Sequence, residues 1–346
     1  MKTATIPGRL STRRTSTRVQ TDGPAAKGLQ IRNVLVPIDF SATSLEAIKC
    51  ALPLIKRFGA DLHLVHVFEL DYPLSSMVAM PLIVPELEVG KRVRRRLKDL
   101  ARKHSMELRR ENIHAVRGRP FEEICRLARE LGIDLIVTST RGNAGLKHLA
   151  LGSTAERVVR YSPCPVLVVR PVDPKKKAGG NGTMTKHELS FGKILVPIDF
   201  SDCSMKGLEY AKALAKQFES RLVLLNSVAL QYYVASDLYM RYDSSLVMQQ
   251  AEKAAQEQMR DLVQKTNWDG IQVEQSLEIG HAGQQICARA QDHGADVIVT
   301  STHGTTGLKH ILLGSTAEYV VRHASCPVLV VPSHERPALT SAKTRV

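Results

Sequence analysis

The chain of 346 residues repeats itself, and this repeat limits its possible folds more than any other feature. VLVPIDFS at residues 34–41 recurs as ILVPIDFS at residues 194–201, with seven of eight positions identical. A longer segment, residues 138–160, recurs at residues 300–322 with 17 of 23 positions identical. The offsets of 160 and 162 residues are nearly equal. The sequence therefore predicts a tandem duplication of one domain.

The repeat also sets the expected domain boundaries. The two copies predict domains at residues 29–172 and 190–332, each long enough to bury its own core. Residues 173–189, rich in lysine and glycine, are expected to form a flexible linker. Residues 1–28 and 333–346 lie outside the repeat and are expected to be disordered tails, the first of them basic.

Each copy alternates short apolar runs with amphipathic stretches. The runs are typical of strands buried on both faces of a parallel sheet, and in the first copy they are residues 34–38, 62–68, 135–138 and 166–169. The stretches predict helices over residues 43–58, 85–109, 120–131 and 153–161, the first capped by Thr43 with Glu46. This order predicts an α/β fold of two doubly wound, five-stranded parallel-sheet domains in tandem, Rossmann-like in architecture.

The net charge of +14 lies mostly outside the two expected domains. The tails and linker together account for +9, which leaves +5 for the domains. With 5% aromatic residues, the chain lacks the stacking side chains of a dedicated nucleic-acid surface, so we expect no specific nucleic-acid partner. Arg94, Arg95 and Arg96 are interpreted as a solvated helix face.

Several features predict a cytoplasmic protein without a membrane partner. No apolar run approaches the roughly 18 to 20 residues that span a bilayer. The N-terminal residues lack the apolar stretch of a secretory signal. The six cysteines are widely spaced and include no CxxC pair, so they are interpreted as small buried side chains in a reducing compartment.

Two segments of each copy leave a strand at its carboxyl end, where doubly wound sheets bind ligands. The first is residues 37–41, matched by residues 197–201, and the second is the loop 139–153, matched by residues 301–315. In the loop, Gly152 precedes Ser153 and Thr154 at a helix start, an arrangement that suits a phosphate. The same residues are also how a loop ordinarily caps a helix, so the loop alone leaves both interpretations open.

The wider pattern resembles the universal stress protein family. Both copies contain an early P-I-D-F-S, followed later by S-T-[RH]-G, nine further residues and G-S. ATP-binding members of that family carry the motif G-x2-G-x9-G-[S/T]. This chain departs at the first glycine of that motif, where it has Ser139 and Ser301. The remaining motif positions match, and these are Gly142, Gly152, Ser153, Gly304, Gly314 and Ser315.

The resemblance implies an adenine nucleotide alpha hydrolase-like fold that binds ATP, with phosphates at the matching glycines and serines. It also implies nucleotide contacts by Pro37, Asp39, Val67, Thr138 and Thr154, and in the second copy by Pro197, Asp199, Thr300 and Thr316. In the second copy, Ser227 and Asn226 replace Val67 and His66, which suggests a more polar base pocket. In the family the last strand pairs with another domain, so the two copies are expected to form an intramolecular pseudo-dimer, with a further homodimer left open.

The role of Asp39 stays open at this stage. Its carboxylate can accept a hydrogen bond from the ribose or base, or help to hold Mg²⁺ with the ATP. It can equally cap the helix that follows, because Asp-Phe-Ser is good capping material.

The sequence contains no P-loop, no nucleophile-and-base pair and no metal cluster. We therefore expect a nucleotide-binding stress-response regulator whose state is read by a protein partner that the sequence does not identify. Two alternatives remain. One is a slow ATPase or self-phosphorylating protein that uses Asp39 and Asp199, and the other is an interaction domain that binds no nucleotide.

Overall fold

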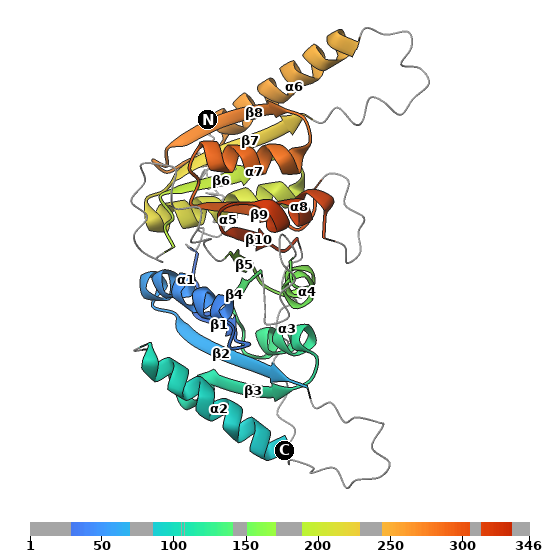
Figure 1. Ribbon diagram of the computed structural model, residues 1–346. Helices are drawn as coiled ribbons and strands as arrows, with labels where there is room; N and C mark the ends of the chain where they lie inside the picture. The colour runs from blue at the N-terminus through green and yellow to red at the C-terminus, as the bar shows by residue number, and fades with distance from the viewer. Residues whose placement is uncertain are drawn as a thin grey trace, which may run out of the picture.

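The computed structural model describes residues 29–69, 86–104, 106, 108–140, 151–170, 189–228, 244–304 and 313–333. Ten strands form one sheet in the order β3-β2-β1-β4-β5-β10-β9-β6-β7-β8 (Figure 1). The first five strands belong to the first copy of the repeat and the last five to the second. The two copies are therefore halves of one continuous sheet.

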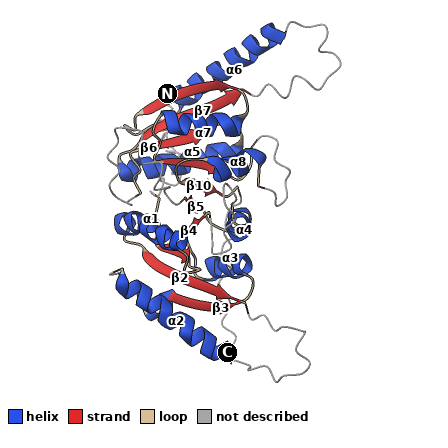
Figure 2. Ribbon diagram, in the orientation of Figure 1, coloured by secondary structure: helices blue, strands red, loops and turns tan. Residues whose placement is uncertain are grey.

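The first copy has the element order expected of a doubly wound domain (Figure 2). Its elements are β1 (Asn33–Pro37), α1 (Ala42–Phe58), β2 (Asp61–Phe68), α2 (Glu86–Lys103), the 3-10 helix η1 (Arg110–Asn112), β3 (Ile113–Arg117), α3 (Pro120–Glu130), β4 (Leu135–Ser139), α4 (Ser153–Tyr161) and β5 (Val166–Val169).

The second copy repeats this order. Its elements are β6 (Lys193–Pro197), α5 (Asp202–Phe218), β7 (Arg221–Val228), α6 (Ser244–Lys265), β8 (Val273–Ile279), α7 (Ala282–Asp292), β9 (Val297–Ser301), α8 (Ser315–His323) and β10 (Val328–Val331). Within each copy all neighbouring strands are parallel. The α/β, doubly wound fold class predicted from the sequence is confirmed.

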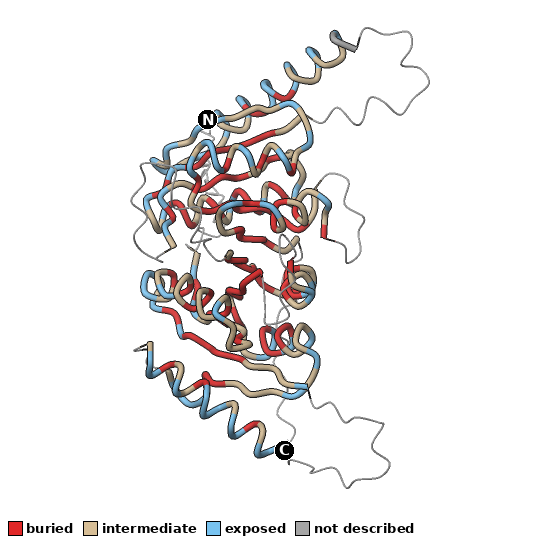
Figure 3. Tube along the Cα trace, in the orientation of Figure 1, coloured by how far each residue is buried: buried red, intermediate tan, exposed pale blue. Residues whose placement is uncertain are grey.

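Helices cover both faces of the sheet, which explains the unbroken apolar runs of its strands. On one face, Leu54 of α1 and Leu97 of α2 pack against Val34 and Leu135 of the strands. On the other face, side chains of α3 and α4, including Ile124 and Val158, complete a second cluster. Figure 3 shows the central strands as buried along their length.

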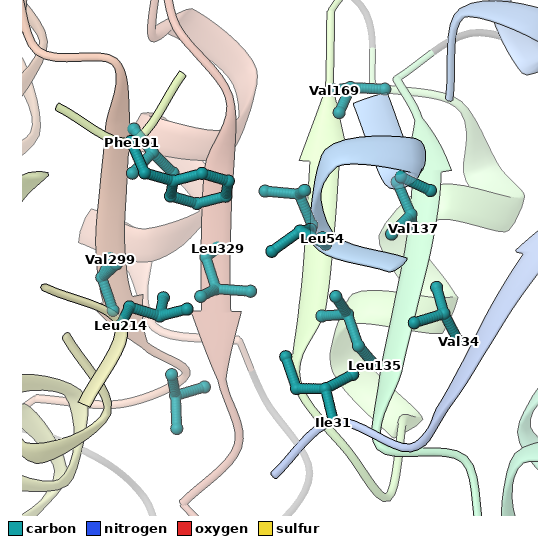
Figure 4. Packing of buried hydrophobic residues seen from close by; sticks show 14 of the residues in the cluster. Ile31, Val34, Leu54, Leu135, Val137, Val169, Phe191, Leu214, Val299 and Leu329 are labelled. Atoms are coloured by element: carbon teal, nitrogen blue, oxygen red, sulfur yellow. The ribbon is translucent and has the colours of Figure 1, made fainter. Parts of the chain in front are cut away.

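The two copies join by the antiparallel pairing of β5 with β10. Leu167 pairs with Leu329, its own counterpart in the repeat, with Val168 opposite Val328 and Val166 opposite Val330. Because counterparts meet at the centre, the register describes a local pseudo-two-fold axis. One buried cluster spans the junction and includes Leu54 and Leu135 of the first copy and Phe191 and Leu329 of the second (Figure 4).

Contacts beside this strand pair support the same axis. Phe58 and Phe218, which are counterparts at the ends of α1 and α5, meet edge to face with ring centroids 6.0 Å apart. On the other face, Arg322 of α8 donates to Glu156 of α4 at 2.9 Å. The apolar last strands thus cover each other's exposed edge, which removes an aggregation hazard.

Two local expectations were wrong. The cap of α1 is Ser41, whose hydroxyl accepts from the backbone N–H of Ser44, and not Thr43. The second helix ends at Lys103, short of residue 109, because η1 and β3 begin soon after it. Among the described helices, none is long and apolar enough to cross a membrane.

Candidate functional site

The order in which strands are added to the sheet reverses between β1 and β4. β2 and β3 lie on one side of β1, while β4 and β5 lie on the other. The carboxyl ends of these two strands therefore flank a topological switch point, the usual ligand position in such sheets. The equivalent position in the second copy lies between β6 and β9. Both segments singled out from the sequence begin at these strand ends.

The turn after β1 holds a strained residue in both copies. Phe40 and Phe200 have φ of 63° and 61°, in the left-handed region that a bulky side chain rarely adopts. The ring of Phe40 is held between His66, at 4.9 Å between ring centroids, and the guanidinium of Arg96, at 3.8 Å from its centroid. Strain of this kind persists only where surrounding contacts fix it, and it gathers at ligand sites.

Asp39 takes part in the cap of α1. Its Oδ1 accepts from the backbone N–H of Ser41 at 3.0 Å and from the Ser41 hydroxyl at 2.5 Å. Asp199 and Ser201 repeat these two bonds at 3.1 and 2.6 Å. The capping role of the aspartate is thus present in both copies.

Side chains of β2 and β7 hold the backbone just after β1 and β6 in place. His66 donates from Nδ1 to the carbonyl of Ile38 at 2.6 Å, and Asn226 donates from Nδ2 to the carbonyl of Ile198 at 2.7 Å. The two side chains differ but make the same bond. The hydroxyl of Ser227 donates to the carbonyl of Gly280 at 3.0 Å, so its polarity is already satisfied within the protein.

The long loop after β4 closes on itself where it meets α4. Gly152 N–H donates to the carbonyl of Thr140 at 2.7 Å, and Gly314 N–H donates to that of Thr302 at 2.8 Å. The Gly152 amide is therefore occupied, and any anion must use the next amides along the chain. The N-cap residues of α4 and α8 are Gly152 and Gly314, so within the described part of the chain no side chain caps the first N–H groups of either helix.

These elements enclose a pocket of about 260 Å³ in the first copy. One wall is apolar, with Val65, Val67 and Ile124. The rest of the lining includes polar groups, among them Asp39 and the start of α4. The predicted site residues among its lining are Pro37, Asp39, Val67, Thr138, Ser139, Gly152, Ser153 and Thr154. Gly142 lies outside the described residues.

The second copy brings the same segments together. A Cβ added at Gly304 would overlap Oδ2 of Asp199, so the carboxylate lies directly against the loop backbone and would have to shift to admit a side chain there. Ser301, at the position of the motif's first glycine, donates its hydroxyl to the carbonyl of His303 at 2.7 Å. Ser301 is 8% exposed, so this hydrogen bond is buried.

The two copies differ beside the helix start. In the first copy a second pocket of about 510 Å³ adjoins Ser153 and Thr154, and Arg119 and Arg157 line it. The guanidinium of Arg157 lies 5.0 Å from the ring centroid of Phe121. In the second copy Gly283 stands at the position of Phe121, and a Cβ there would lie 2.7 Å from the ring of Tyr319, the counterpart of Arg157.

The sequence missed several residues that shape the site. Phe40 and Thr140 lie within the repeated P-I-D-F-S and S-T-[RH]-G patterns, but the sequence assigned no role to either residue, nor to His66. The second-copy residues Pro197, Thr300, Gly314, Ser315 and Thr316 stand at the equivalent strand ends and helix start.

Cysteine chemistry gains no support from the described geometry. Burial raises the pKa of the Cys125 and Cys287 thiols to about 11 and that of Cys326 to about 12, so these thiols stay protonated at neutral pH.

Comparison with known proteins gives a consistent result. The model of the universal stress protein family matches residues 30–170 and residues 190–332. A universal stress protein of Methanocaldococcus jannaschii is 34% identical over 153 residues, covering 42% of this chain and 85% of the relative. The universal stress protein YxiE of Bacillus subtilis is 35% identical over 145 residues, covering 40% of this chain and 97% of the relative. Each relative thus corresponds to one half of the chain.

A solved structure matches the whole arrangement. The crystal structure of a universal stress protein from Archaeoglobus fulgidus aligns with a TM-score of 0.58 at 22% identity. The alignment covers 88% of this chain and 97% of that one, which shows a shared fold.

Proposed function

Because this chain belongs to the universal stress protein family, whose model matches both of its halves, we propose that it binds adenine nucleotides, ATP by preference. The single observation that carries the proposal is the pocket at the switch point of the first copy. There apolar side chains line the same pocket as an aspartate and a helix start that no described side chain caps. An apolar slot beside a cluster of phosphate donors is what a nucleotide requires.

The lining suggests a place for each part of the ligand. The base would lie against Val67 and Ile124, and the ribose would lie near Asp39 and Thr138. The phosphates would accept from the N–H groups and hydroxyls of Ser153 and Thr154. Mg²⁺ would arrive on the phosphates, as it usually does at nucleotide sites. In the second copy Asp199, Thr300, Ser315 and Thr316 would serve in the same places.

We expect the two sites to be unequal, with the first binding ATP more tightly. Arg119 and Arg157 place fixed positive charge beside the phosphate end of the first site, where the second has His281 and Tyr319. The contrast at the base is smaller than the sequence suggests, because the Ser227 hydroxyl is already bonded to Gly280. Titration calorimetry that finds the second site equal or stronger at neutral pH would contradict this ranking.

The proposed role is regulatory: a cytoplasmic stress-response protein whose nucleotide state is read by a protein partner. It is tested by mass spectrometry of small molecules that copurify with the full chain, followed by calorimetry with ATP, ADP, AMP and GTP. We expect an adenine nucleotide in the purified protein and tighter binding of ATP than of GTP. Failure to bind any nucleotide would overturn the proposal, and steady hydrolysis would instead favour a slow ATPase.

A further inference from the structure

The two halves carry opposite charge, although they share one fold. Residues 30–170 contain 23 Lys and Arg against 15 Asp and Glu, whereas residues 190–332 contain 12 against 15. The modest total for the two domains therefore conceals one basic and one acidic half. Because the fold is the same, the second copy serves as an internal reference for what the fold itself requires.

The difference is concentrated at the two ends of the sheet. Residues 86–119, which include α2 and β3, contain twelve Lys and Arg against five Asp and Glu. Their counterparts, residues 244–281 with α6 and β8, contain three against six. β3 and β8 are the outermost strands, so the basic and acidic segments lie at opposite ends of the molecule (Figure 1).

Most cations of α2 lie on its exposed side, whereas Arg96 lies against Phe40. Val93, Leu97 and Leu100 turn inward and pack in the core, which leaves the opposite side of the helix exposed (Figure 3). Some of its charge is neutralised locally, as in the pair Lys91 with Glu88. Arg92, Arg94, Arg95 and Lys103 are exposed, and none of them forms an ion pair with another described residue.

The shape and composition of this surface select among anionic partners. The apolar side of α2 is used inside the protein, so the helix has no face to insert into a bilayer. Residues 86–119 contain no aromatic residue, so there is no platform on which single-stranded bases could stack. Nine of the twelve cations are arginine, whose planar fork matches phosphate oxygens. A convex helix of roughly 27 Å can also follow the groove of a duplex.

We propose that α2 and the adjoining β3 edge form a docking surface for duplex nucleic acid, bound through its phosphates without reading its sequence. Binding of this kind depends on counterion release, so it weakens steeply as salt increases. The surface lies at the outer edge of the sheet. Of its cations, Arg96 contacts Phe40 beside the proposed nucleotide site, so the test below leaves Arg96 in place and uses cations elsewhere on α2.

The test uses the full chain and a 30-base-pair DNA duplex of mixed sequence, with fluorescence anisotropy measured from about 50 to 200 mM salt. The variant Arg92→Gln, Arg95→Gln, Lys103→Gln removes three exposed cations from α2. The matched control Lys253→Gln, Arg260→Gln, Lys265→Gln removes three exposed cations from α6. Both keep the basic residues 1–28, so their difference isolates α2 from the N-terminal segment.

We expect the parent and the α6 variant to bind with the same steep salt dependence. In the α2 variant the slope of log K against log salt should become shallower by about 2 to 3. Equal slopes for all three proteins would overturn the proposal, as would absence of duplex binding at 50 mM salt. So would sedimentation showing that α2 instead mediates association between copies of this chain, or α2-dependent binding to anionic vesicles but not to DNA.

Discussion

Gly152 and Gly314 have φ of −63° and −60°, which is backbone that any residue can adopt. Their requirement for glycine is therefore a matter of space. A Cβ would lie 3.3 Å from the Thr140 carbonyl oxygen at Gly152, and 3.2 Å from that of Thr302 at Gly314. These are tight contacts that a small shift can relieve, so a side chain can be accommodated by the fold while still intruding on the pocket.

This separation of folding from binding gives a sharp test. Gly152→Val should abolish ATP binding in the first domain, and Gly314→Val should do so in the second, because the new side chain occupies the approach to the helix start. Loss of stability should be about 1 kcal/mol for each change at a helix cap. Circular dichroism and calorimetry measure the two effects. A folded double variant that binds ATP as tightly as the parent would contradict the proposed phosphate site.

Substitution of Ser153 should be milder. Ser153→Ala removes one hydroxyl donor and leaves the backbone N–H groups in place. We expect ATP affinity to fall by about 0.5 to 1.5 kcal/mol, which is a factor of roughly 2 to 13. If the second site is the weaker one, Ser315→Ala should reduce the ATP bound by the full chain less than Ser153→Ala does. If Ser153→Ala abolished ATP binding in the first domain, the backbone N–H groups could not be the main donors to the phosphates.

The pair His63 and His114 predicts a pH dependence of stability. Their ring nitrogens lie 3.2 Å apart, and burial lowers the pKa of both, that of His114 to about 4. The unfolded chain takes up protons as pH falls below about 6.5, while the folded chain keeps these rings neutral. The contribution of this pair to the free energy of unfolding should therefore be greatest above pH 6.5 and should decrease as the pH falls toward 4.

The second copy supplies the control for this prediction. Val223 and Ser276 stand at the equivalent positions, so the double variant His63→Val, His114→Ser should have a flatter stability profile. Urea denaturation between pH 4 and 8 compares the two proteins. Carboxylates affect both in the same way, so parallel profiles would rule out the histidine pair as the cause.

At the scale of the secondary structure elements, the turn between β1 and α1 combines two tasks. Asp39 bonds to Ser41, and Ser41 caps the helix, so the aspartate and the helix end form one unit. The sequence could not separate capping from ligand binding, because both use the same residue types. In the second copy Asp199 also lies against Gly304, which places the carboxylate beside the loop as well as beside the cap.

Two substitutions distinguish these tasks. Ser41→Ala removes the cap and should cost about 1 kcal/mol of stability with little change in ATP affinity. Asp39→Asn keeps an oxygen acceptor for Ser41 but removes the charge, and should weaken ATP binding about tenfold more than Ser41→Ala does, as expected for loss of a charge-assisted bond. Calorimetry on the Gly314→Val background isolates the first site. Equal affinities for the two variants would show that Asp39 serves the cap alone.

Most elements could be predicted from the sequence because central strands are buried on both faces and read as apolar runs. The outermost strands were not predicted in this way. β3 is partly exposed over most of its length, so IHAVR carries no continuous apolar signal. The cap was misplaced because Ser41, Thr43 and Ser44 are all capable of it. His66 and Asn226 make the same bond with different side chains, which comparison of the repeats cannot reveal.

At the scale of the whole molecule, the β5–β10 pair unites the halves. Leu167 and Leu329 are 1% and 3% exposed and lie opposite each other at its centre. The ion pair between Glu156 and Arg322 lies nearer the solvent, with side chains 24% and 32% exposed. A buried apolar contact of this kind contributes far more to stability than a partly exposed ion pair, which is worth about 0 to 1 kcal/mol.

Leu329→Asp should therefore separate the halves, because it places a carboxylate in the shared core. Small-angle scattering should show a larger radius of gyration, and circular dichroism should verify that helices remain. Arg322→Gln should leave the scattering curve unchanged. The pairing would be refuted as the main link if Leu329→Asp kept the parent's dimensions while Arg322→Gln expanded the molecule.

The symmetric register between counterparts has a consequence for how this protein can change over generations. When two identical chains meet, every mutation appears on both sides of the assembly at once. Here each half is encoded separately, so a mutation alters one side and leaves the other intact. Tyr319 opposite Gly283, where the first half has Arg157 and Phe121, is a difference that two identical chains could never hold together. Joining the copies fixes their ratio and frees each to specialise.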